Sequence, residues 1–582
     1  MRDLKYVAAY LRPCRRDLIL AVLLLVVESF LEMMIPLLMT DIVDVGVANR
    51  DVPFILWQGG KMALCALVAL GTGLLYAHFA ARTAYRFGAE IRLAEYRKLQ
   101  DFSFSNLDRF SVPSLVTRMT TDITVMQNAV NNGLRPMVRG PVMLVLGIWL
   151  AFLLNRRLAL VFVICAPILG VLLAVIVHKV GPLYNRQQKA VDHVNGFVQE
   201  SLTAIRAIKA FVRGKFEAEQ FEDVNSELMN ATRSTFGRAV LNQPSFQLVM
   251  YTTVVLIMWY GGRMILVGGM SVGDLTGFLS YVIQVINSLM MISNVFLMLT
   301  RSLASARRIR EVLEEEPTLR NPAKPVDEVA SGQIDFEDVS FQYARDAEKS
   351  SLSHVELHIP AGSTVGIIGG TGSAKSTLVQ LIPRLYDATE GTVRVGGRDV
   401  RDYDLAVLRD AVGIVLQKNV LFSGTIRENL RWGDPDADDE TLWKACEAAC
   451  ADEFLRRMPK GLDTDLGQGG VNVSGGQKQR LCIARTLLKK PRVLIFDDST
   501  SAVDTATEAR IRRSLSEMKN VTKIIIAQRL TSVMEADQII ILEDGRIHAV
   551  GTHRQLLDQD PIYQEIYASQ MKGGQDDAYE KC

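Results

Sequence analysis

The chain has 582 residues, of which 49% are hydrophobic, and its 65 basic and 64 acidic side chains give a net charge of +1. This length is too great for one domain, and the balanced charge gives no case for a nucleic-acid partner. The seven cysteines fit no zinc spacing, and we expect them to be buried thiols in the membrane or a reducing cytosol.

Apolar stretches in the first half of the chain are long enough to cross a bilayer. Glycine and polar residues interrupt several of them, as is typical of helices packed in a bundle. A soluble domain that buried all of them would need an unusually large core. The sequence therefore predicts an all-α membrane domain over residues 17–305, with six spans at 18–39, 60–81, 138–154, 159–178, 246–267 and 275–298.

Charge around the first span predicts its orientation. Residues 1–16 carry five Arg and Lys side chains, whereas the first connecting loop carries Asp41, Asp44 and Asp51. Positive-inside reasoning places the N-terminus in the cytosol. The 1–16 segment is too basic, and too interrupted by Pro13, for a cleavable signal, so we expect an amphipathic helix on the inner membrane face. Six spans return the second half to the cytosol, which predicts a multi-pass protein of the plasma membrane.

Polar residues inside the spans are candidates to line a cavity for a small molecule. Glu28 and Glu32 are four residues apart on the first span, and an unpaired carboxylate in hydrocarbon costs a few kcal/mol. They should face a wet cavity or a partner, and a cavity with acids and apolar walls suits small amphipathic cations, of a drug-like or lipid-like kind. Gln284, Asn287 and Asn294 recur at helical spacing on the last span and are candidates for the same cavity. The alternative is that the acids bond to neighbouring helices.

A phosphate-binding loop follows the buried-strand pattern at 364–368. Its glycines let backbone N–H groups turn toward phosphate, and the next helix adds a partial positive charge. Lys375 is placed to reach the outer phosphates and Ser376 to ligate Mg²⁺. Ala374 stands where the last glycine is expected, so its methyl group can crowd the loop. The loop residues are Gly369, Gly370, Thr371, Gly372, Ser373, Ala374, Lys375, Ser376 and Thr377.

Further motifs follow in a fixed order. Asp497 ends an apolar strand at 493–497, where its carboxylate can hold Mg²⁺ through water. Gln417 lies between the two strands, as does the run Val473, Ser474, Gly475, Gly476 and Gln477. Together these residues resemble the nucleotide-binding domain of ATP-binding cassette (ABC) transporters. The resemblance covers 334–569, and it implies an α/β P-loop domain with a helical signature subdomain, joined to an exporter-type membrane domain by a linker at 306–333. A polar tail at 570–582 follows.

The resemblance assigns roles to single residues. In that family two chains sandwich two ATP molecules, and each site takes its P-loop from one chain and its signature from the other. Tyr343 would stack on adenine, although a buried structural tyrosine suits its position too. Gln417 would contact Mg²⁺ and sense the membrane domain, and Ser501 and Asp504 would lie along the dimer seam. Segments 114–122 and 202–211, in the two long cytosolic loops, resemble those that dock coupling helices on the nucleotide-binding domains.

Two positions depart from the family pattern. Asp498 replaces the usual glutamate and so stops about 1.5 Å short of the attacking water. Gln528 replaces the usual histidine and cannot carry a positive charge. The signature is intact apart from Val473, which replaces leucine. We therefore predict one half of a heterodimeric exporter whose own P-loop forms the weaker ATP site. A slow homodimer, an ATP-gated regulatory subunit and an inward-running transporter are the alternatives.

Overall fold

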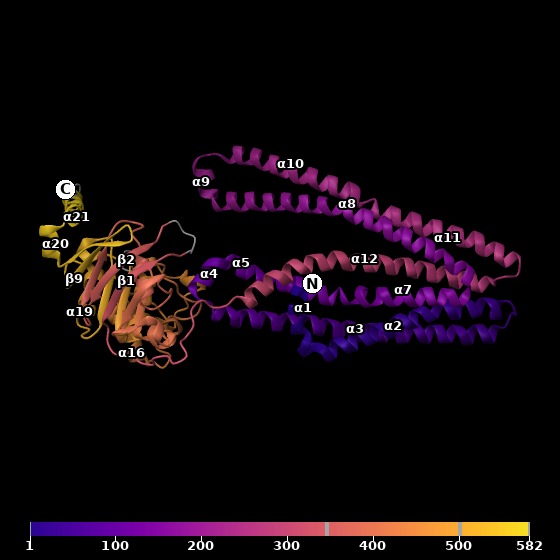
Figure 1. The fold of residues 1–582 in the computed structure, drawn as a ribbon, viewed down its shortest axis with the longest axis horizontal. Coiled ribbons are helices and arrows are strands. Elements are labelled where there is room, and N and C mark those ends of the chain that lie inside the picture. The colour runs from indigo at the N-terminus through magenta and orange to yellow at the C-terminus, as the bar shows by residue number, and fades with distance from the viewer. Residues whose placement is uncertain (1, 344–348, 499–502, 580–582) are drawn as a thin grey trace. The chain divides into compact units, whose positions relative to one another are not determined.

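We describe the protein from a computed structural model, which covers residues 2–343, 349–498 and 503–579 (Figure 1). Some side chains within 161–185, 242–243, 293–301 and 571–579 lie outside this description. The chain forms two compact units. Unit 1 comprises residues 1–100 and 112–315, and unit 2 comprises residues 101–111 and 316–582.

Unit 1 consists of helices. Two of them begin at side-chain caps, because Asn155 accepts the N–H groups of Arg157 and Leu158, and Ser271 accepts that of Asp274. A 3₁₀ helix (Ala9–Cys14) and two π-helical segments (Ile42–Val47 and Arg118–Asp122) connect neighbouring helices. The α-helices are α1 (Arg2–Ala8), α2 (Arg15–Asp41), α3 (Val52–Gln100), α5 (Val112–Thr117), α6 (Ile123–Asn131), α7 (Leu134–Leu154), α8 (Arg156–Thr203), α9 (Ile205–Ala210), α10 (Gly214–Ala239), α11 (Asn242–Leu266) and α12 (Val272–Glu314).

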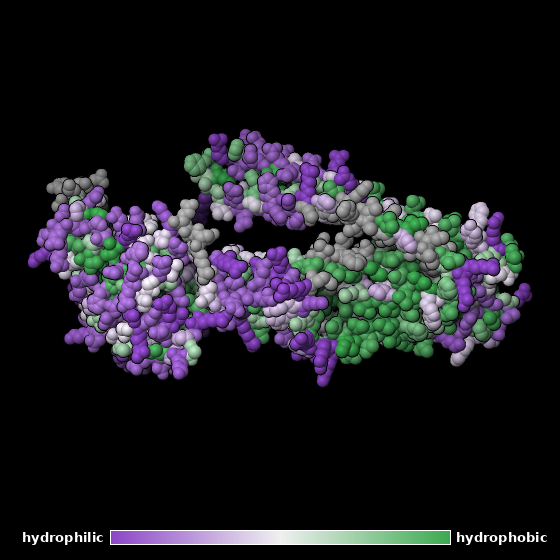
Figure 2. All heavy atoms as spheres, viewed as in Figure 1, coloured by the Kyte–Doolittle hydropathy of each residue, from purple (hydrophilic) through white to green (hydrophobic). Residues whose placement is uncertain are grey.

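Among the described residues, five helical segments are long and apolar enough to cross a membrane: Arg2–Val47, Val52–Gln100, Val112–Leu154, Gly214–Leu266 and Val272–Ile292. Each overlaps one of the predicted spans. The remaining predicted span, 159–178, lies within α8, and most of its side chains are outside the description. Figure 2 shows hydrophobic residues covering a broad face of the unit 1 bundle.

The core of the bundle lies between α2, α7 and α12. Met33, Met143 and Tyr281 are buried there, and the Tyr281 hydroxyl donates to the Met33 carbonyl oxygen over 2.9 Å. A Cβ atom on Gly147 would lie 2.7 Å from Val285 Cγ2, so only glycine allows α7 to approach α12 this closely. Small residues of this kind are what the interrupted apolar stretches of the sequence predicted.

Unit 2 contains two β-sheets. The larger sheet has the order β10-β9-β3-β8-β7-β6, with every pair parallel except β10 with β9. Its central strands are buried along their length, as in parallel sheets covered on both faces. The smaller sheet is antiparallel, with the order β2-β1-β4-β5. The strands are β1 (Ile334–Phe341), β2 (Leu352–Ile359), β3 (Thr364–Ile368), β4 (Glu390–Val395), β5 (Arg398–Asp399), β6 (Val412–Val415), β7 (Val493–Asp497), β8 (Thr522–Ile526), β9 (Gln538–Glu543) and β10 (Arg546–Gly551).

The helices of unit 2 cover the larger sheet and build a separate helical region. In that region α15, α16 and α18 share a buried cluster that includes Ile426, Leu442 and Leu481. The helices are α4 (Phe104–Phe110), α13 (Lys375–Leu381), α14 (Leu405–Ala411), α15 (Ile426–Leu430), α16 (Asp439–Ala448), α17 (Asp452–Leu455), α18 (Gly475–Leu488), α19 (Thr505–Ser516), α20 (His553–Gln559) and α21 (Pro561–Tyr579).

The structure distinguishes two parts of the first cytosolic loop. We predicted that 114–122 docks on the nucleotide-binding domain, yet α5 and the π-helical segment that follows it belong to unit 1. The segment that joins unit 2 is 101–111, which contains α4. Ser111 ends α4 with a positive φ of 44°, and Pro113 then suits the first turn of the next helix. The helix of this loop that belongs to unit 2 therefore ends before Val112 and Pro113.

Candidate nucleotide site

The P-loop leaves β3 and wraps around the side chain of Lys375. The Lys375 ammonium donates to the carbonyl oxygens of Gly369, over 3.0 Å, and Gly370, over 2.7 Å. Burial lowers the pKa of Lys375, although Asp498 and Asp497 act in the opposite direction. The loop borders a cavity of about 1280 Å³ that is also lined by Tyr343, Gln417, Asp497, Asp498 and Gln528. The structure thus brings these predicted residues to one site.

Gly369 shows why the loop needs glycine. Its φ is +155°, and a Cβ atom there would lie 2.2 Å from the carbonyl oxygen of Leu542. Ala374 is different, because it adopts a left-handed conformation with φ of 71° although it has a side chain. Its methyl group is partly buried and packs against the core cluster under the P-loop. The side chain at this position thus costs conformational free energy, because alanine disfavours a left-handed backbone. Burial of the methyl group offsets that cost.

We expect Ala374→Gly to change the dissociation constant for MgATP by less than about threefold, because relief of the left-handed strain and loss of one buried methyl group nearly cancel. Calorimetric titration of the purified chain with MgATP would measure this. Ala388→Gly, which removes a partly buried methyl group packed against the same cluster, is the control. A tenfold gain in affinity for Ala374→Gly would show that the methyl group does obstruct the phosphates.

The oxygen atoms expected to hold Mg²⁺ lie together. Ser376 Oγ donates to Asp497 Oδ1 over 2.8 Å, and Gln417 lines the same cavity. Asp497 is 3% exposed, and burial raises the pKa of its carboxyl group. Hydroxyl, carboxylate and amide oxygens are the ligands that Mg²⁺ prefers, so this donor set fits the ion.

The two departures from the family pattern contact each other. Gln528 Nε2 donates to Asp498 Oδ2 over 2.6 Å. The Asp498 backbone has a positive φ of 48°, and its N–H donates to the Ile526 carbonyl oxygen on the neighbouring strand over 3.1 Å. The short carboxylate at the position of the general base is therefore fixed in place by the amide that replaces histidine.

Tyr343 lies at the edge of the cavity with half of its surface open. Its side chain is 51% exposed, and its hydroxyl is 3.0 Å from Thr377 Oγ1 at the end of the P-loop. The ring packs edge-on against Phe341, with centroids 4.8 Å apart. This exposure disfavours the buried structural role and leaves aromatic surface for a base.

The signature residues cap α18. Ser474 Oγ accepts the N–H of Gln477 over 3.3 Å, and Gln477 Oε1 accepts the N–H of Ser474 over 2.9 Å, which makes a capping box. Val473 is buried under them, whereas Ser474 and Gly475 are exposed at the helix start. Asp504 caps α19, and its hydrogen bonds with Thr507 lower its pKa. The predicted seam residue Ser501 lies outside the described residues.

Comparison with known proteins identifies the family. Residues 18–289 match the ABC transporter transmembrane region, and residues 352–501 match the ABC transporter domain. The chain is 38% identical over 562 residues to the uncharacterized ABC transporter ATP-binding protein YfiB of Bacillus subtilis, covering 97% of this chain and 98% of YfiB. The chain belongs to the ABC transporter family.

Other relatives support the exporter architecture of this ABC transporter. The putative multidrug export ATP-binding/permease protein YgaD of Bacillus subtilis is 31% identical, over 98% of this chain and 100% of YgaD. A bacterial Atm1-family ABC exporter with ATP bound superposes with a TM-score of 0.81 at 25% identity, over 96% of this chain and 98% of the other. The protein is a multi-pass plasma-membrane exporter chain that binds ATP and couples its hydrolysis to transport.

The acidic pair in the membrane domain of this ABC transporter has basic partners that the sequence analysis missed. Glu28 and Glu32 on α2 form ion pairs with Arg135 and Arg139 on α7, and Arg139 lies 3.5 Å from Glu28 as well. The Arg135 guanidinium also lies 5.8 Å from the ring of Tyr76 on α3. The arginines are four residues apart, as the glutamates are, and this matching spacing was the signal available in the sequence.

The other predicted cavity residues lie on α12. Gln284 is half-buried, and its amide oxygen has no hydrogen-bond partner among the described residues. Asn287 is exposed, three residues further along the helix. The side chain of Asn294 lies outside the described residues. Gln284 is thus a polar acceptor held within a largely apolar helix.

Proposed function

We propose that this chain is one half of a heterodimeric exporter and that its own P-loop forms the weaker of two ATP sites. The observation that carries the proposal is the contact between Asp498 and Gln528. The carboxylate is too short for a water placed for glutamate, and it is held by a neutral amide. The signature at the start of α18 is intact, so this chain is better equipped to complete a partner's site than to hydrolyse ATP at its own.

ATP at this site would remain bound over several transport cycles. Tyr343 would stack on adenine, Lys375 would neutralise the outer phosphates, and Ser376, Gln417 and Asp497 would hold Mg²⁺. Binding of ATP would close the two nucleotide-binding domains and turn the transport cavity outward. Hydrolysis at the site completed by the partner's P-loop would then reset the transporter.

The cargo we propose is a hydrophobic or amphipathic small molecule. Because Arg135 and Arg139 neutralise Glu28 and Glu32, the acidic pair gives no net charge with which to attract a cation. Gln284 and Asn287 supply polar groups within the apolar part of α12 that we predicted to span the membrane. YgaD, a relative over the whole chain, is described as a putative multidrug exporter, which supports the same class of cargo.

A surface of unit 2 is suited to receive the partner chain. Phe422 and Trp432 stack with centroids 4.1 Å apart at a cavity of about 360 Å³. In unit 1, Phe211 and Val212 follow α9 and are 77% and 87% exposed. Two adjacent and strongly exposed apolar side chains at the end of a helix are candidates for a contact with a partner. We propose that the loop around α9 of the second chain inserts its apolar tip into this aromatic cavity.

Purification of the tagged chain from its native membranes tests the pairing. Mass spectrometry should identify a second ABC half-transporter in equal amount, with glutamate and histidine at the positions equivalent to Asp498 and Gln528. Recovery of this chain alone, at the mass of a dimer, would overturn the heterodimer in favour of a slow homodimer. A vesicle assay of ATP-dependent accumulation separates a pump from a regulatory subunit.

A further inference from the structure

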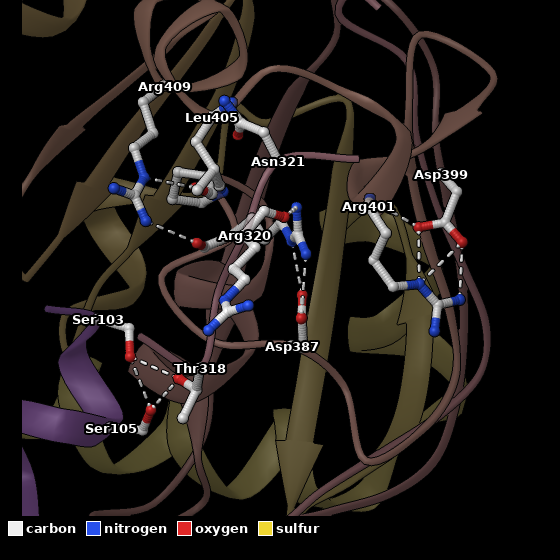
Figure 3. A network of polar contacts seen from close by, with 12 residues as sticks. Ser103, Ser105, Thr318, Arg320, Asn321, Asp387, Asp399, Arg401, Leu405 and Arg409 are labelled. Carbon is white, nitrogen blue, oxygen red and sulfur yellow. Dashed lines mark hydrogen bonds and ion pairs between the residues drawn. The ribbon is translucent and has the colours of Figure 1, made fainter. Parts of the chain in front are cut away.

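Helix α4, which belongs to unit 2, is anchored at its N-terminal end to the segment after Glu315. Ser103 Oγ lies 2.5 Å from Thr318 Oγ1, and Ser105 Oγ lies 2.6 Å from the same hydroxyl (Figure 3). Asn106 donates to the carbonyl oxygen of Glu316 over 3.1 Å. These contacts fix the start of the helix to the segment that leads into the nucleotide-binding domain, but they involve no residue of the ATP cavity.

Two further contacts of α4 within unit 2 involve Tyr386. The Tyr386 hydroxyl donates to Asp108 Oδ2 over 2.8 Å, and its ring lies 6.0 Å from that of Phe104. Burial, together with the bond to Asp108, raises the pKa of Tyr386, so its hydroxyl keeps its proton and acts as a donor at any physiological pH. One tyrosine thus contacts two residues on successive turns of the helix.

Tyr386 is held in position by the segment that follows the P-loop helix. Its neighbour Asp387 accepts two hydrogen bonds from the guanidinium of Arg384, over 2.7 and 3.2 Å. The Arg384 side chain is buried, and Arg409 donates to its backbone carbonyl oxygen over 2.9 Å. Because its backbone is fixed in this way, we expect a displacement of the Tyr386 ring to move the residues that it contacts, without being absorbed by a change of rotamer.

On its other side, Tyr386 contacts the residue that we assign to adenine. The rings of Tyr386 and Tyr343 meet edge to face, with centroids 5.3 Å apart and an interplanar angle of 87°. Phe341 packs against both rings, at 4.8 Å from Tyr343 and 5.5 Å from Tyr386. Edge-to-face pairs have a preferred geometry, so a base that reorients Tyr343 changes the favoured position of Tyr386.

We propose that Tyr386 is a positioning residue that links adenine binding at Tyr343 to the seating of helix α4. The link runs from Tyr343 through the Tyr386 ring, and from the Tyr386 hydroxyl to Asp108. It rests on the proposed role of Tyr343 at this chain's own ATP site. While ATP stays bound at this site, the link would keep α4 in contact with Tyr386. The partner's site would meanwhile hydrolyse ATP. The effect on α4 therefore requires the adenine base, whereas the P-loop binds only the phosphates.

Hydrogen–deuterium exchange on the full chain in lipid nanodiscs tests the link. MgATP should slow exchange across Phe104–Phe110 by about fivefold, the effect expected when one typical hydrogen bond is strengthened. Tyr386→Phe, which removes only the hydroxyl, and Asp108→Ala, which removes its acceptor, should each abolish the slowing. Magnesium tripolyphosphate, which lacks a base, should leave α4 unchanged. MgATP and magnesium tripolyphosphate are each used at about ten times the dissociation constant measured for the variant in question. The fraction of P-loops occupied is then the same in every sample.

Tyr403→Phe is the matched control, because the Tyr403 hydroxyl also makes one hydrogen bond within unit 2, to the Val395 carbonyl oxygen over 2.8 Å. This variant should keep the slowing caused by MgATP. Equal slowing in Tyr386→Phe and the unchanged chain would overturn the proposal, and so would slowing by tripolyphosphate. The experiment reads binding at this chain's own P-loop, so its failure is distinct from a failure of the pairing with a second chain.

Discussion

The double change Asp498→Glu and Gln528→His is expected to raise the ATPase rate of the purified chain by about 100-fold, the low end of what a general base contributes. Glutamate restores the reach of the carboxylate toward the attacking water. Histidine removes the short amide contact on that carboxylate and can carry positive charge toward the γ-phosphate. Because the signature is intact, two copies of the variant would complete two competent sites.

Steady-state phosphate release in lipid measures this effect, with the two single changes measured beside the double change. We expect Asp498→Glu alone to give most of the gain, since it supplies the base. Adding Lys375→Ala to the double variant should abolish the gain, which shows that the new activity uses this chain's own P-loop. Rapid hydrolysis by the unchanged chain, with no gain in the variant, would mean that Asp498 is an adequate base and that the chain works as a homodimer.

The nucleotide site was largely predictable because its residues are tied to local sequence. The P-loop must follow a buried strand, Asp497 must end one, and the signature must begin a helix, and the structure has each of these features. The distance between Asp498 and Gln528 was not predictable, because they follow different strands, β7 and β8. These strands are parallel neighbours, and that adjacency brings the two side chains within 2.6 Å.

The membrane domain was predictable in its spans but not in its side-chain pairs. Apolar length marks a span, whereas the helix that faces Glu28 is set by packing between distant parts of the chain. The helix of the first cytosolic loop that belongs to unit 2 was not predictable for a related reason. Segments 104–110 and 114–122 both have helical composition, and only contacts with the linker, such as Asn106 with Glu316, distinguish the segment that joins unit 2.

The ion pairs between α2 and α7 are expected to stabilise the bundle strongly once formed. Replacing Arg139 with glutamine would leave Glu32 without its partner and Glu28 with Arg135 alone. Breaking a buried ion pair from one side costs about 3–5 kcal/mol, because the remaining charge stays desolvated. Thermal unfolding of the detergent-solubilised Arg139→Gln chain should therefore begin about 5–10 °C lower than that of the unchanged chain.

The second change Glu32→Gln should restore most of that loss. In the double variant both positions carry an uncharged glutamine, so no unpaired charge is left there. The ion pair between Glu28 and Arg135 remains. A double-mutant cycle over Arg139 and Glu32 gives their coupling free energy directly. Arg157→Gln, which removes an exposed arginine at the start of α8, controls for the loss of one positive charge.

The outcome also decides how these charges serve transport. Rescue by Glu32→Gln would mean that Arg139 and Glu32 act as a structural pair, with no charge left over for a cargo. If Arg139→Gln unfolds at the same temperature as the unchanged chain at both pH 6 and pH 8, water already reaches Glu32 and Glu28, because a carboxyl group that instead took up a proton would make the unfolding temperature depend on pH. The acidic pair would then line the wet transport cavity, and cationic cargo would again be favoured.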